Sequence, residues 1–453
     1  MSPQPQPDSP QPASPDPTRR DSPLGSNTRS VETPRAATPL AAPLDAAATD
    51  PLFDEPVPRR GTDSSKWNSD SRDDILPLWV ADMDFRTAPA IIDALRERVQ
   101  HGIFGYVSVP AAYDQALTGW YAHRHSWSFP AEHILHTTGV VPAISAALRA
   151  LTRPGDGVLV QTPVYNCFFS SIRNMGCRAI ASPLRREGDH YLMDFEDLER
   201  RAADPRTTVM LLCNPHNPVG RVWTPDELRR LSDICRRHRL ALISDEIHGD
   251  LALPGYRYTP CASLPGNSDS CITLVSASKA FNIAGLQLAS IICADPETRR
   301  RIDRAINIHE VCDVNPFGVA AAIAAYTRGE EWLNRLLAYL QGNYLELCRY
   351  FSRHLPQLPV IRLEGTYLVW VDCRSLLNTP AAAVTAGAGS SGPVGADSAP
   401  SLADRLLDST GLRLNGGELY GAEGYGYLRW NIACPRRTLR DALERFRRFV
   451  DTL

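Results

Sequence analysis

Between residues 157 and 295, short apolar runs alternate with longer polar stretches of helical character. The runs are "GVLVQTP" (157–163), "TVMLLCNP" (208–215), "LALISDEI" (240–247), "CITLVSAS" (271–278) and "ASIICAD" (289–295). They are rich in β-branched residues and apolar at consecutive positions, which is typical of strands buried on both faces of a sheet. The alternation of such strands with helices predicts an α/β fold.

The stretch between the second and third runs, "TPDELRRLSDICRRHR", shows the start signals of a helix. Thr224 is a natural N-cap, Pro225 suits the first helical position, and Glu227 completes a capping box. The apolar residues expected on its buried face are Leu228, Leu231, Ile234 and Cys235. This region therefore predicts a βαβ unit.

Two regions lack this alternation. Residues 1–50 contain eleven of the 37 prolines and no aromatic residue, so they have little apolar area to bury. We expect a disordered, proline-rich tail over residues 1–55. The low-complexity stretch 378–401 interrupts ordered sequence on both sides and predicts an inserted surface loop.

Composition limits the class of protein. The 453 residues suffice for about two to three domains, and 22% charged with 43% hydrophobic residues is the balance of a soluble globular protein. A net charge of −3 gives no electrostatic reason to expect nucleic acid or an anionic membrane as a partner. The eleven cysteines show no metal-ligand spacing, and no membrane span or signal peptide is evident, so we expect no metal and a reduced cytoplasm.

One lysine stands out in "SASKAFNIAGLQ" (276–287), because Lys279 has no charged residue within eight positions on either side. Burial at a strand end disfavours the ammonium form and lowers the pKa of a lysine, as a nucleophilic amine requires for a Schiff base. The alternative is a lysine that extends from a strand end to solvent. The lysine alone does not separate these interpretations.

Other chemically informative residues follow the remaining runs. In an open α/β sheet the ligand lies beyond the carboxyl ends of the strands. Gly139 and Val140 stand at the expected start of a helix, where free N–H groups favour an anion. The residues that follow the runs are Tyr165, Asn217, Asp245, His248, Ser276, Ser278 and Lys279. Together they suit a planar, phosphorylated aromatic aldehyde, and pyridoxal phosphate is such a molecule.

The motifs "NPHNPVG", "SDEIH" and "SASKAFNIAGLQ" resemble those of fold-type-I pyridoxal-phosphate enzymes. With "LWVADMDF" (78–85), "HGIFGY" (101–106), "GTYLVWVDCR" (365–374) and "YLRWNIACPR" (427–436), the chain resembles the MalY/PatB-type C–S lyases, also called cystathionine β-lyase-like enzymes. The match covers roughly residues 56–453 apart from the insert. It implies a mostly parallel central sheet in a large domain (101–330). It also implies a smaller α+β domain (331–453), to which segment 56–100 contributes.

The resemblance implies a role for each matching residue. Lys279 would bind the cofactor covalently and then remove the substrate Cα proton, Asp245 would pair with the ring nitrogen, and Arg429 would bind the substrate carboxylate. The implied cofactor contacts are Lys279, Asp245, Asn217, Tyr165, His248, Ser276, Ser278, Val140, Val141 and, from a neighbouring subunit, Tyr106. That last contact implies a homodimer with shared active sites.

Each residue also has an ordinary structural interpretation. Asp245 alone would be read as a helix N-cap and Asn217 as part of an Asn-Pro turn. Tyr165 alone would be packing, and Arg429 a surface arginine at a strand end. Gln287 and His248 occupy positions where aminotransferases of this fold often carry arginine and tyrosine, and both differences agree with the C–S lyase branch.

The resemblance implies cleavage of L-cystathionine or related cysteine S-conjugates to a thiol, pyruvate and ammonia. An aminotransferase would use the same residues, and a regulatory protein that binds a transcription factor is an alternative from another class. The sequence has no helix-turn-helix extension, which favours the enzyme.

Overall fold

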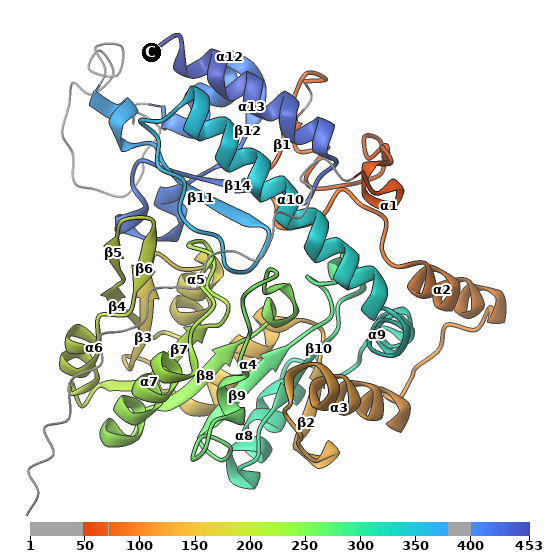
Figure 1. Ribbon diagram of the computed structural model, residues 1–453. Coiled ribbons are helices and arrows are strands. Elements are labelled where there is room, and N and C mark those ends of the chain that lie inside the picture. The colour runs from red at the N-terminus through yellow and green to blue at the C-terminus, as the bar shows by residue number, and fades with distance from the viewer. Residues whose placement is uncertain (1–48, 71, 379–399) are drawn as a thin grey trace, which may run out of the picture. The chain divides into compact units, whose positions relative to one another are not determined.

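A seven-stranded sheet organises the computed structural model, which describes residues 49–70, 72–378 and 400–453 (Figure 1). The strands are β2 (Ile134–Thr137), β3 (Gly157–Thr162), β4 (Arg178–Pro183), β7 (Thr207–Cys213), β8 (Ala241–Asp245), β9 (Cys271–Val275) and β10 (Ala289–Ile292). Their order is β2-β10-β9-β8-β7-β3-β4. All neighbours from β4 to β9 pair in parallel, whereas β10 pairs antiparallel with both β9 and β2. The predicted α/β fold with a mostly parallel sheet is confirmed.

The five apolar runs form β3, β7, β8, β9 and β10, and all five strands are buried almost throughout. Each strand ends one to three residues before its run does, at the point where the polar residues begin. Those residues therefore lie beyond the carboxyl ends of the strands. Strands β2, "ILHT", and β4, "RAIASP", were not predicted from the sequence, because both are only partly buried and neither forms a continuous apolar run.

Helices cover both faces of the sheet. One face packs against α4 (Val140–Leu151), α5 (Asn166–Asn174) and α8 (Pro296–Asn307). The opposite face packs against α6 (Phe195–Ala202) and α7 (Pro225–His238), and α3 (Ala111–His125), α9 (Pro316–Arg328) and α2 (Pro89–His101) belong to the same core. A small hairpin, β5 (Arg185–Glu187) with β6 (His190–Leu192), follows β4.

Helix α7 begins as predicted from the sequence. The Thr224 hydroxyl accepts from the Glu227 N–H at 3.2 Å, and the Glu227 carboxylate accepts from the Thr224 N–H at 2.9 Å. The predicted face of Leu228, Leu231, Ile234 and Cys235 is buried. This capping box typically contributes about 1 kcal/mol to the stability of a helix, and it starts α7 at the position that lets β7 and β8 pair in parallel.

The C-terminal part contains a three-stranded antiparallel sheet with the order β11-β14-β13. Its strands are β11 (Leu368–Asp372), β13 (Asn415–Gly416) and β14 (Tyr427–Asn431), and its helices are α10 (Glu330–His354), α12 (Leu402–Thr410) and α13 (Arg436–Val450) (Figure 1). Two short strands, β1 (Leu76–Pro77) and β12 (Leu412–Arg413), pair in parallel. The division into domains at residues 100 and 330 stays a prediction.

The predicted tail over residues 1–55 is too long at its C-terminal end. Residues 1–48 lie outside the described residues, but Pro51–Asp54 form the short helix α1, in which Phe53 is fully buried. The Phe53 ring lies 5.1 Å from that of Phe85, and Tyr339 donates to the Asp54 carboxylate at 2.5 Å. One aromatic residue thus anchors a segment whose composition otherwise resembles the tail. The predicted insert also falls mostly outside the described residues.

Among the described helices, none combines the length and the apolar character that crossing a bilayer requires.

Candidate active site

The parallel pairing aligns the predicted residues at one edge of the sheet. Cys213, the last residue of β7, lies opposite Asp245, the last residue of β8, and Asp245 lies opposite Leu274 of β9. Asn217 therefore follows β7 on the same edge where Asp245 ends β8. Lys279 follows β9 by four residues. The structure brings these residues together as the sequence predicts.

Lys279 has the isolated environment that its sequence context indicates. Its Nζ donates to the carbonyl oxygen of Ala81 at 2.7 Å, and no described carboxylate lies within ion-pair distance of it. Burial, reinforced by the positive charge of Arg429, lowers the pKa of Lys279 to about 8. An amine with this pKa has a substantial unprotonated fraction near neutral pH, as a nucleophile or a base needs.

Asp245 is a buried carboxylate without a cationic partner in the described chain, and it is only 3% exposed. Its Oδ1 accepts from the N–H of Ile247 at 3.2 Å, which corresponds to the local capping expected of an isolated aspartate. Burial raises the pKa of Asp245 to about 7, and the neighbouring Glu246 adds to this. A protonated ring nitrogen would provide the missing partner and favour the ionised carboxylate.

Arg429 does not face solvent, so its interpretation as a surface residue is wrong. It lies on β14 and is 3% exposed. Its Nη1 donates to Asn217 Oδ1 at 3.2 Å and its Nη2 to the Trp79 carbonyl at 2.7 Å, while its Nε has no hydrogen-bond partner in the part of the chain that the structure describes. Its guanidinium also lies 5.0 Å from the Tyr420 ring. No described carboxylate pairs with it, and a buried guanidinium in these surroundings fits an anionic ligand.

His248 and Tyr165 complete the central group. His248 is buried, and its Nδ1 has no hydrogen-bond partner in the described chain. Burial, with the charges of Lys279 and Arg429, lowers the pKa of His248 to about 3, so the ring is neutral at ordinary pH. Tyr165 precedes α5 and is partly exposed, and burial of its hydroxyl raises the pKa of Tyr165 above its usual value.

The predicted phosphate contacts form a second group. Gly139 is the N-cap of α4, it supplies no side-chain cap, and Val140 is the first residue of that helix. The amides of Val140 and Val141 therefore belong to the first turn, where N–H groups have no partner inside the helix. The Ser276 hydroxyl donates to the Leu288 carbonyl at 2.6 Å and accepts from the Ser278 N–H at 3.1 Å. The Ser278 hydroxyl has no partner among the described residues.

Tyr106 is not brought to this group. Its side chain is fully exposed, and it lines a shallow hollow of about 230 Å³ together with Phe104, Gly105, Val107, Asp313 and Val314. The assignment of Tyr106 to a neighbouring subunit stays a prediction.

Sequence reasoning missed the backbone carbonyls that accept hydrogen bonds from Lys279 and Arg429. Segment 79–85 carries the Trp79 and Ala81 carbonyls, and Tyr367 donates to the same Ala81 oxygen at 2.9 Å. Asn431, two residues after Arg429, binds the Val80 and Asp82 carbonyls. The sequence signal for this contact of Asn431 was its position as an amide side chain within the apolar stretch "YLRWNIAC".

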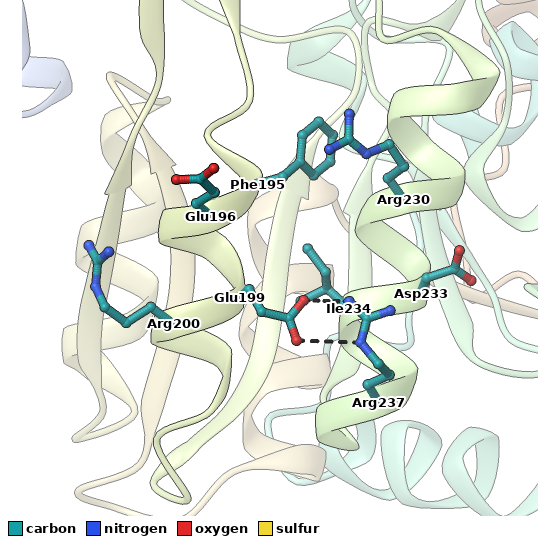
Figure 2. A pocket seen from close by; sticks show the side chains of 8 residues that line it. All are labelled: Phe195, Glu196, Glu199, Arg200, Arg230, Asp233, Ile234 and Arg237. Carbon is teal, nitrogen blue, oxygen red and sulfur yellow. Dashed lines mark hydrogen bonds and ion pairs between the residues drawn. The ribbon is translucent and has the colours of Figure 1, made fainter.

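A larger hollow, of about 600 Å³, lies elsewhere, between α6 and α7 (Figure 2). We call this hollow the α6–α7 groove; it is lined by Phe195, Glu196, Glu199, Arg200, Arg230, Asp233, Ile234 and Arg237. Figure 2 shows Glu199 and Arg237 paired across it. None of the residues predicted for the site lines this groove.

Comparison with known proteins gives consistent results. Residues 73–446 match the family described as aminotransferase class I and II. The chain is 38% identical over 400 residues to the cystathionine beta-lyase PatB of Bacillus subtilis, covering 87% of this chain and 98% of that protein. It is 31% identical over 393 residues to the protein MalY of Escherichia coli, covering 85% and 95% respectively. The PLP-bound C-S lyase of Staphylococcus hominis matches with a TM-score of 0.80 at 31% identity, covering 88% of this chain and 98% of that one.

Proposed function

The chain belongs to the aminotransferase class I and II family, and from this premise we propose that it is a pyridoxal-phosphate-dependent C–S β-lyase. Its substrates are L-cystathionine or related cysteine S-conjugates, and its products are a thiol, pyruvate and ammonia. The resemblance found in the sequence is confirmed, since the PatB and MalY proteins align over most of the chain. The observation that carries the proposal is the convergence of Lys279, Asp245 and Arg429, each without an ion-pair partner in the described chain.

The side chains present fit pyridoxal phosphate. Lys279 would hold it covalently and Asp245 would pair with its ring nitrogen. Asn217 would bind the ring 3-oxygen, Tyr165 would stack on the ring, and His248 would contact it as well. The phosphate would accept hydrogen bonds from the amides of Val140 and Val141 and from the Ser278 hydroxyl. Ser276 would donate to it after its O–H turns away from the Leu288 carbonyl. When bound, the cofactor supplies an electron-withdrawing ring that stabilises negative charge on an attached carbon.

Lys279 is the group best suited to take the substrate Cα proton. Its lowered pKa, about 8, leaves roughly a tenth of the amine free to accept a proton at pH 7, far more than an ordinary lysine would have. Once the proton is removed, the β-carbon–sulfur bond breaks and the thiolate departs with the electron pair. The remaining three-carbon fragment hydrolyses to pyruvate and ammonia.

Arg429 binds the substrate carboxylate. Two of its nitrogens already donate to fixed acceptors, Asn217 Oδ1 and the Trp79 carbonyl, so the guanidinium is held before the substrate arrives. Nε has no partner among the described residues. The charge and the prior orientation both favour a carboxylate over a neutral group.

We further propose a homodimer with shared active sites, in the cytoplasm. Val99, Ile103, Phe104, Tyr106 and Ile308 are exposed large apolar residues, and their side chains are between 43% and 101% accessible in the single chain. Clustered exposed apolar residues are typical of an interaction surface. A second copy that covers this surface would bring Tyr106 to the phosphate of its neighbour.

The test measures pyruvate and free thiol from L-cystathionine, with the absorbance of the bound cofactor recorded on the same sample. We expect a yellow protein that releases pyruvate and thiol in equal amounts. An aminotransferase would instead convert an added keto acid to an amino acid without net thiol release. A colourless protein, or a yellow one that releases no thiol from any cysteine conjugate, contradicts the proposal.

A further inference from the structure

Three successive carbonyls of segment 79–85 accept hydrogen bonds from the side chains of Asn431, Lys279 and Tyr367. The carbonyls of Val80 and Asp82 both accept from Nδ2 of Asn431, each at 2.6 Å. The carbonyl between them, that of Ala81, accepts from Lys279 Nζ at 2.7 Å and from the Tyr367 hydroxyl at 2.9 Å. Neighbouring peptide planes are linked by only two soft dihedral angles, so fixing the planes on both sides restrains the plane of the Ala81 carbonyl.

Every polar group of the Asn431 side chain is used in this arrangement. Asn431 is completely buried, both hydrogens of its amide are used by the two carbonyls, and its Oδ1 accepts from the Ala433 N–H at 2.8 Å. Residues two apart on a strand point to the same face. Arg429 and Asn431 therefore meet segment 79–85 from the same face of β14, and Arg429 takes the Trp79 carbonyl.

Two further contacts hold the segment from other directions. Asn282 accepts from the Met83 N–H at 2.9 Å and donates to the Phe85 carbonyl at 2.9 Å. Lys66, whose side chain is fully buried, pairs with Asp84 at 2.9 Å. The segment is thus fixed along its length, and Asn431 contacts the part that faces the lysine.

We propose that Asn431 is a positioning residue for the reaction: by binding the carbonyls on either side, it directs the Ala81 carbonyl at the amine of Lys279 whenever that amine is not bound to the cofactor. The inference rests on the proposed function, in which the substrate displaces the lysine and the free amine then takes a proton. A carbonyl that accepts one N–H orients the amine lone pair. The same hydrogen bond strengthens once the amine becomes an ammonium, so it favours proton uptake.

The test compares two matched substitutions, Asn431→Ala and Asn343→Ala. Asn343 is equally buried and also donates to two carbonyls, those of Ile432 and Cys434, each at 2.9 Å, but it does not contact segment 79–85. The reactivity of each lysine toward acetic anhydride is measured against pH by mass spectrometry, on the full-length chain with its cofactor removed. We expect Asn431→Ala to lower the pKa of Lys279 by about one unit, a tenfold change in proton affinity. Asn343→Ala should leave that pKa unchanged.

A second variant keeps the proposal testable if Asn431→Ala does not fold. Tyr367→Phe removes the other donor from the Ala81 oxygen, so the lysine has that acceptor to itself and its pKa should rise slightly. In the holoenzyme, Asn431→Ala should lower kcat about tenfold at unchanged cofactor content. An unchanged Lys279 pKa in Asn431→Ala, or an equal shift in Asn343→Ala, overturns the inference; if Asn431→Ala does not fold, an unchanged Lys279 pKa in Tyr367→Phe does so. Failure of the proposed function would appear separately, as a parent enzyme that releases no thiol.

Discussion

The α6–α7 groove and the candidate active site are both rich in charged side chains, but these are exposed and paired in the groove and buried in the site without an ion-pair partner among the described residues. Two acidic residues that line the groove are paired, Glu199 with Arg237 across it and Asp233 with Arg236 on the same helix. All four side chains are more than 40% exposed. In the site, Asp245 and Arg429 are each about 3% exposed, and neither has an opposite charge within ion-pair distance in the described chain. The groove is a hollow of about 600 Å³, yet its acidic side chains Glu199 and Asp233 already have cationic partners.

This difference indicates where a ligand belongs. Exposed ion pairs contribute about 0–1 kcal/mol to stability, so they report little about function. A buried charge without a partner lowers the stability of the fold by several kcal/mol. Such charges occur typically at functional sites, where a bound ligand supplies the opposite charge. Unpaired burial is therefore a better guide to this active site than the size of the hollow.

Replacing Lys279 should have the largest effect on the site. Lys279→Ala removes the covalent attachment and the proposed base, and elimination should fall by about 10³-fold or more. Borohydride reduction followed by peptide mapping should place the cofactor on Lys279 in the parent and nowhere in the variant. Lys66 is the internal control, because it is buried but paired with Asp84. Cofactor found on Lys66 or another lysine would contradict the assignment.

Asp245→Asn and Asp233→Asn compare an unpaired buried carboxylate with a paired exposed one. The first substitution should lower elimination by about 10²- to 10³-fold, because the ring nitrogen loses its charged partner. The second should change activity less than about twofold, since Asp233 contributes only a surface ion pair. Steady-state rates of pyruvate release measure both. Equal losses would remove Asp245 from its proposed role.

Arg429→Lys should raise KM for cysteine conjugates by about 10- to 100-fold, because a point charge cannot reproduce a two-nitrogen contact with a carboxylate. The protein should remain yellow. A substrate with an amidated carboxylate sharpens the comparison, since the parent should bind it poorly and the variant should lose little more. An equal loss of affinity for acid and amide would make Arg429 structural.

The smallest expected effect comes from replacing His248, and it concerns how the free energy of unfolding depends on pH. The pKa of His248 in the folded chain, about 3, lies below its ordinary value, so the unfolded chain binds more protons between about pH 3 and pH 6.5. The folded state therefore loses stability as pH falls through that range. His248→Asn cannot take up this proton, and between pH 6 and pH 5 it should lose about 1 kcal/mol less than the parent. Urea unfolding of cofactor-free protein measures the difference, and identical slopes would place His248 outside the buried site.

Local patterns account for what the sequence predicted well. Buried strands, the Thr224 capping box and the polar residues that follow each strand depend on neighbours within a few positions, so Asp245, Asn217 and Lys279 were found in advance. The antiparallel direction of β10 was not predicted, because an apolar run has the same pattern in either direction, and one of its two partners, β2, lies about 150 positions earlier.

The missed parts of the site depend on backbone and on distance. The Ala81 carbonyl has no signature in residue type, and Asn431 contacts a segment about 350 positions earlier in the chain. Phe53 was assigned to the tail because the boundary was placed at residue 55, beyond the aromatic-free stretch 1–50, and its partner Phe85 lies outside any local pattern around it. A local pattern could not reveal these contacts.

The distance between segment 79–85 and Asn431 also affects how the chain matures during synthesis. All the strands of the seven-stranded sheet, and Lys279 between β9 and β10, leave the ribosome before β14 is made. Domains generally fold as they emerge, from the N-terminus onward. The segment that meets the lysine is therefore translated early but docks late, after Arg429 and Asn431 arrive together on one strand. A chain that stops short of residue 427 would retain the reactive amine without the groups that orient it.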